Sequence, residues 1–133
     1  MSGTSTTQVT GSGGIRMGFN FTRLDPYSFY TGLGAQTSLT FLDGTDALSV
    51  GGLLKMGTQK TSGDVALTLN IAAQSGSPQI NLVSGNGSCE ITVDTATADS
   101  IAGSFRCDHV KAAKGLFLNI EGAFSGTMPG AGG

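Results

Sequence analysis

The chain has 133 residues, which fits one domain and is enough to bury a hydrophobic core without a metal or a dense set of disulfides. Its net charge of −2 excludes the concentrated basic surface that proteins reading nucleic acid usually carry. No apolar run approaches the ~18 residues that a transmembrane helix needs, which excludes a helical membrane span.

Both ends of the chain are predicted to lie outside the folded core. Residues 1–13 are rich in Gly, Ser and Thr and have almost no apolar side chain, so we expect a flexible tether. We expect a disordered tail over residues 127–133, which leaves a single β domain over residues 14–126. The tether is typical of an exported protein beginning at its mature start. It also fits a lipoprotein whose signal and acylated cysteine were replaced by Met1.

Alternation of apolar and polar residues predicts the strands, and the glycine-rich segments between them indicate turns. The clearest alternation lies at 64–71, where four apolar side chains share one face of a strand. A helix would distribute the same four side chains around its circumference. Residues 108–114 are the one segment that favours a helical turn, with Asp108 as its cap. In chain order the predicted strands are 15–22, 37–42, 47–50, 52–57, 64–71, 79–83, 88–94, 101–107 and 115–125.

Two of these strands predict a hairpin in which the cysteines face each other. Pairing Ile91 with Phe105 aligns the two apolar faces, and the same register places Cys89 directly opposite Cys107. A slip of one residue would destroy both matches, so the register is well determined. The hairpin therefore predicts a Cys89–Cys107 disulfide, which implies an oxidising compartment outside the cytoplasm.

The spacing around this hairpin resembles a known group of proteins. Cys89-x-Ile91-x-Val93, then Gly103-x-Phe105-x-Cys107, then Gly122-x-Phe124 is similar to the end of many bacterial secreted lipoproteins with no assigned chemistry. Those often carry C-x-V-x-V…G-x-F-x-C…G-x-F in this region. The resemblance covers residues 88–125 and implies export and attachment to the cell envelope. It implies no catalytic residue.

About eight or nine short strands with frequent turns predict an all-β fold. We expect an antiparallel β-sandwich of two sheets. A closed up-and-down β-barrel is the alternative, and its interior would leave room for a ligand.

Few residues offer chemistry. His109 is the single histidine and has no triad motif around it, so we expect it to be an inert loop residue. Asp43 and Asp46 supply closely spaced oxygens and are a weak candidate for calcium, although the full loop pattern of a calcium site is missing. The acidic residues lie mostly at turns, and no carboxylate pair stands out for acid–base catalysis. We expect no catalytic residue and no cofactor.

Tyr27, Phe29 and Tyr30 form the one candidate binding surface, because clustered aromatic side chains are common in recognition sites. The sequence as a whole predicts a non-enzymatic, extracytoplasmic domain that acts in binding or assembly at a bacterial cell surface. Its partner would be a second copy, a surface protein or a glycan. Two alternatives stay open, a carrier of a small apolar ligand and a hydrolase that uses carboxylates.

Overall fold

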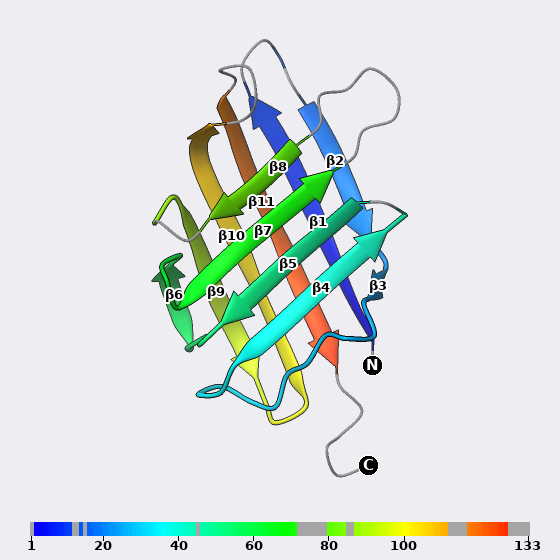
Figure 1. The fold of residues 1–133 in the computed structure, drawn as a ribbon, viewed down its shortest axis with the longest axis vertical. Helices are drawn as coiled ribbons and strands as arrows, with labels where there is room; N and C mark the ends of the chain where they lie inside the picture. Colours follow the sequence, from blue (N-terminus) through cyan, green and yellow to red (C-terminus); the bar gives the residue numbers. More distant parts are fainter. Residues whose placement is uncertain are drawn as a thin grey trace.

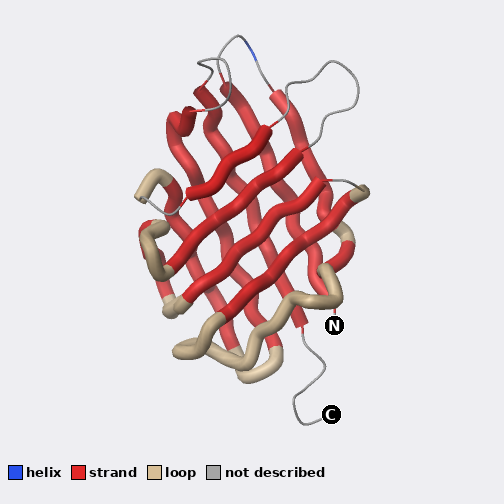
Figure 2. Tube along the Cα trace, viewed as in Figure 1, coloured by secondary structure: helices blue, strands red, loops and turns tan. Residues whose placement is uncertain are grey.

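The computed structural model describes residues 2–11, 14, 16–44, 46–71, 80–84, 87–111 and 117–127, and at residues 71, 80–84 and 111 only the backbone. These residues form eleven strands and no α-helix (Figure 2). The six-stranded sheet has the order β2 (Arg16–Phe21), β1 (Ser2–Gly11), β11 (Phe117–Thr127), β10 (Ser100–Lys111), β9 (Cys89–Ala96) and β6 (Gly57–Lys60). The five-stranded sheet has the order β3 (Arg23–Leu24), β4 (Thr37–Asp43), β5 (Asp46–Gly52), β7 (Val65–Ile71) and β8 (Ile80–Ser84).

The two antiparallel sheets pack face to face, which confirms the predicted β-sandwich. Figure 1 shows the strands of the five-stranded sheet crossing those of the six-stranded sheet at a steep angle. Apart from the excursion of β6, the chain visits neighbouring strands in sequence order, as in an up-and-down barrel. Within the described residues, however, no ladder joins β2 to β3 or β8 to β9, so the sheets are not closed into a barrel.

The predicted tether is wrong, because residues 2–11 form β1 in the interior of the six-stranded sheet. β1 pairs with β11 on one side and with β2 on the other, so its backbone groups are bonded along both edges. Its side chains alternate between buried and exposed, although Val9 is the only large apolar one. The hydroxyl of Ser5 compensates for its own burial by donating to the Ala123 carbonyl oxygen at 2.7 Å. Residues 2–11 are therefore part of the β domain, and β11 extends through Thr127 into the predicted tail, whose other residues lie outside the described part.

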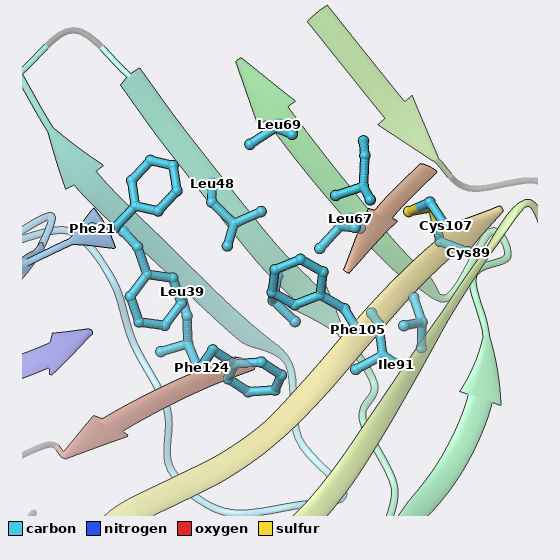
Figure 3. Close-up of a cluster of buried hydrophobic side chains, with 14 of the residues drawn as sticks. Phe21, Leu39, Leu48, Leu67, Leu69, Cys89, Ile91, Phe105, Cys107 and Phe124 are labelled. Atoms are coloured by element: carbon cyan, nitrogen blue, oxygen red, sulfur yellow. A yellow bond between two sulfur atoms is a disulfide. The ribbon is translucent and has the colours of Figure 1, made fainter. Parts of the chain in front are cut away.

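The core lies between the sheets and is built from the inward positions of both (Figure 3). Phe41, Leu48, Leu67 and Leu69 project from the five-stranded sheet and are completely buried. Opposite them, the inward residues of the six-stranded sheet follow the predicted alternation, except for Val9, which lies in the segment predicted to be a tether. They are Val9, Phe21, Ile91, Val93, Ile101, Phe105, Leu118, Ile120 and Phe124.

Two glycine–phenylalanine pairs lie side by side between β10 and β11. Gly103 is opposite Phe124 and Phe105 is opposite Gly122, and the two rings stack with centroids 6.5 Å apart. A Cβ atom on Gly122 would collide with the Thr6 carbonyl oxygen and press on the Phe105 ring. The recurring G-x-F spacing in the sequence therefore has a packing explanation, in which each glycine makes room for the ring across from it.

The predicted helical turn at 108–114 is wrong where the structure describes it, because β10 continues through Lys111. A bulge between Cys107 and Val110 interrupts its pairing with β11. His109 lies in this bulge with φ of 54°, and its N–H donates to Asn119 Oδ1 at 2.8 Å. Across the bulge β10 has one residue more than β11, so the alternation of buried and exposed side chains resumes at Val110, which is buried.

The predicted strand at 52–57 is also wrong, because Gly52 ends β5. Its φ of 114° disfavours a side chain, and a Cβ atom at this position would collide with the Asp64 carbonyl oxygen. After the loop 53–56 the chain enters the other sheet as β6, which pairs with β9.

Candidate functional site

The hairpin prediction is confirmed in register and in chemistry. Ile91 pairs with Phe105, and Cys89 pairs with Cys107 as a disulfide with a Cα–Cα distance of 4.1 Å. Both cysteines are buried in the core beside Ile91 (Figure 3). The disulfide therefore acts as part of the scaffold, inaccessible to substrates.

Two of the three predicted aromatic residues are exposed on the segment that joins β3 to β4. The carboxylate Oδ1 of Asp25 accepts a hydrogen bond from the Tyr27 N–H at 2.8 Å, and its carbonyl accepts one from the Ser28 N–H. This turn around Pro26 leaves the Tyr27 side chain 90% exposed. A large aromatic side chain held in solvent by a defined turn is typical of a recognition residue.

Phe29 lies two residues further along and is also exposed, with the buried Ser28 between them. Its backbone exchanges two hydrogen bonds with Ser38, so the segment follows the edge of β4 (Figure 1). Ser38 in turn pairs with Gly51, and both are small, so no large side chain stands beside the ring along this row. Phe29 is 46% exposed and forms, with Tyr27, the surface called here the aromatic edge.

Tyr30 does not belong to the aromatic edge, because it is only 3% exposed and is part of the core. Its hydroxyl donates to the Thr97 carbonyl oxygen in the loop between β9 and β10. Burial, and then the charge of Asp99, raise the pKa of Tyr30 above its ordinary value of 10.0. Tyr30 thus anchors the segment that presents Tyr27 and Phe29.

A second candidate surface, which the sequence analysis missed, is the outer face of the six-stranded sheet. Three adjoining hollows of about 530, 330 and 260 Å³ follow its central strands. Their outward side chains are polar or small, with Gln8, Arg106 and Glu121 shared by the two largest hollows. β1 contributes to this face from one end of the chain, and β9, β10 and β11 contribute from the other, so no local motif signals it.

One ion pair lies on this face. Arg106 Nε donates to Asp108 Oδ1 at 3.0 Å, and both side chains are about two-thirds exposed. The hydrogen bond to Asp108 and its charge raise the pKa of Arg106, and Glu121 and Glu90 on the neighbouring strands raise it further. Because the pair is exposed, it contributes little to stability.

The structure gives no support to metal binding at Asp43 and Asp46. They face each other at the end of the β4–β5 hairpin. In the part of the chain that the structure describes, no group of three or more His, Cys, Asp or Glu side chains is placed to hold a metal ion. His109 stacks on Phe117 with ring centroids 4.0 Å apart, so its ring has a packing contact.

No observation in the described residues favours either alternative function, the hydrolase or the carrier of an apolar ligand. Glu90 and Glu121 line the same hollow, but both are exposed and Arg106 lies on the strand between them. The three hollows lie on the outer face of the sandwich and not in its interior, unlike the enclosed apolar cavity that a carrier requires.

The described residues include no helix long and apolar enough to cross a membrane. Comparison of the chain with protein-family models, with curated protein sequences and with solved structures found no match in any of the three.

Proposed function

We propose that this chain is a non-enzymatic, extracytoplasmic domain that binds a partner at a bacterial cell surface through its aromatic edge. The observation that carries the proposal is the exposure of Tyr27 and Phe29 on a segment held firmly on both sides. Hydrogen bonds to Asp25 and Ser38 fix its backbone, and Tyr30 fixes it to the core. A segment whose backbone is already ordered loses little conformational entropy on binding, which favours affinity.

The location outside the cytoplasm is supported by the Cys89–Cys107 disulfide, because such bonds persist in oxidising compartments. The resemblance of residues 88–125 to secreted lipoproteins points the same way and adds attachment to the envelope. Binding without catalysis is supported by the roles of the reactive side chains that the structure describes. His109 packs on Phe117, and Arg106 is paired with Asp108.

The test measures binding of the labelled protein to isolated bacterial cell envelopes and to an array of surface glycans. We expect the double variant Tyr27→Ser/Phe29→Ser to bind at least about tenfold more weakly, because truncating an exposed aromatic anchor removes most of its contact energy. The matched control is Leu53→Ser/Met56→Ser, which removes two exposed apolar side chains from the loop between β5 and β6. Equal binding by the wild type and the Tyr27/Phe29 variant would refute the proposal.

A further inference from the structure

A row of alternating charges crosses four strands on the outer face of the six-stranded sheet. The strand registers place Glu121 of β11 beside Arg106 of β10, and Arg106 beside Glu90 of β9. Glu90 is in turn beside Lys60 of β6. All four side chains are exposed and point away from the core, so the row reads negative, positive, negative, positive.

This charge row is complementary to itself, because reversing its direction exchanges every positive charge with a negative one. A twofold axis parallel to the strands, midway between β10 and β9, would bring two copies face to face with the row reversed. Glu121 of one protomer then faces Lys60 of its partner, and Arg106 faces Glu90. The other in-plane axis, across the strands, would set like charges against each other and is disfavoured.

We propose that the outer face of the six-stranded sheet is a twofold interface between two copies of this chain. The partner at this interface is a second copy of the chain, because the charge row on this face is complementary to the same row on another copy. The proposal goes beyond the proposed function, does not depend on it, and concerns a different surface from the aromatic edge.

The next row of the face fits the same axis. The four side chains of this row are all small, so they do not prevent the charged side chains of the two copies from meeting. The axis places Ser104 opposite Thr92, and Ala123 opposite Thr58. The two remaining acidic side chains on this face, Asp94 and Asp108, lie outside both rows. Asp94 lies at the register shift between β9 and β10, and Asp108 lies in the bulge of β10. Within these two rows, no like charges meet across the interface.

The size of the overlap predicts a weak dimer. About eight residues along β9, β10 and β11, with the four residues of β6 beside them, cover at most about 20 Å by 25 Å, or up to roughly 500 Å² per copy. Stable interfaces bury about 800 Å² per partner, so association should depend on protein concentration and weaken with salt. The hollow of about 530 Å³ over Arg106 would be enclosed between the copies, where it can hold bridging water.

The experiment is sedimentation velocity of the purified, disulfide-bonded chain over a range of concentrations at low and high salt. We expect a reversible monomer–dimer equilibrium that shifts towards the monomer at high salt. Glu121→Lys alone and Lys60→Glu alone should each raise the dissociation constant at least about tenfold, because each creates two like-charge contacts per dimer. Asp43→Lys makes the same charge change as Glu121→Lys, but on the other sheet, and should leave the dissociation constant unchanged.

The decisive variant is the exchange Glu121→Lys/Lys60→Glu. Glu121 and Lys60 are three strands apart in one molecule, so their charges meet only across the twofold interface. If the dimer forms as proposed, the exchange restores the dissociation constant to within about threefold of the wild type. If the row only stabilises its own sheet, the two changes place like charges beside Arg106 and Glu90, and their effects add. A chain that stays monomeric at all concentrations, or an exchange that fails to restore the dimer, overturns the proposal. Tyr27→Ser/Phe29→Ser should leave the dimer unaffected.

Discussion

At the scale of single residues, the β10–β11 pair depends on glycines that cannot accept a methyl group. Gly122→Ala would drive its Cβ into the Thr6 carbonyl oxygen and the Phe105 ring. We expect the free energy of unfolding to fall by more than about 2 kcal/mol, because the backbone of a central strand has no room to move. Urea denaturation followed by circular dichroism measures the change.

The control for this prediction is Gly18→Ala on the outer face of β2, where the nearest atom to an added Cβ is Gln8 Nε2 at 3.5 Å. That substitution should change stability by less than about 0.5 kcal/mol. Equal costs at the two positions would contradict the steric explanation and would point to a general effect of glycine on the unfolded chain.

Tyr30 gives the fold a dependence on alkaline pH. Its raised pKa means that the folded state favours the neutral phenol more than the unfolded state does. The stability it contributes is therefore fully present below its ordinary pKa of 10.0 and is lost as the pH rises through the higher folded value. Tyr30→Phe should cost about 1 kcal/mol at neutral pH, through loss of the bond to Thr97, and should lose less stability on going to pH ~11. Denaturation midpoints of both proteins at pH ~8 and ~11 test this, and parallel declines would contradict it.

At the scale of elements, the 89–107 hairpin was predictable because two local patterns specify the same register. The apolar alternation and the cysteine positions both require Ile91 opposite Phe105. β1 was not predictable in the same way. Its hydroxyl-rich residues have little hydrophobicity, and they are ordered by pairing with β2 and β11, which lie elsewhere in the sequence. Composition alone shows the low hydrophobicity of β1 but not its pairing with β2 and β11.

The disulfide should stabilise this hairpin without determining its register. Cys89 and Cys107 are 18 positions apart, and closing a loop of that size contributes about 3 kcal/mol. We expect Cys89→Ala/Cys107→Ala to lose about that amount and to keep its β-sheet circular dichroism, because Ile91, Val93 and Phe105 still align the strands. Urea denaturation of the variant, and of the wild type with and without reductant, measures the loss. A variant that is unfolded without denaturant would show that the disulfide is required for the fold itself.

At the scale of the whole molecule, the sequence predicts two sheets but not how the strands are divided between them. β6 joins the six-stranded sheet although β5 and β7, its neighbours in the chain, pair with each other in the five-stranded sheet. That division creates the charge row, because Lys60 comes beside Glu90 only when β6 pairs with β9. The aromatic edge could be partly predicted, since Pro26 and the alternation beyond it are local. Which of its three aromatic residues is buried depends on a contact with the distant Thr97.

β1 connects the two ends of the chain within one sheet, so its side chains should matter to the whole fold. Val9 is fully buried between the sheets, whereas the next residue, Thr10, faces solvent. Val9→Ala should lower the free energy of unfolding by about 2 kcal/mol, through lost burial and the cavity left behind. Thr10→Ala should change it by less than about 0.5 kcal/mol. Chemical denaturation of both variants, with the transition of the whole domain as the signal, separates a central strand from a tether, in which both changes would be silent.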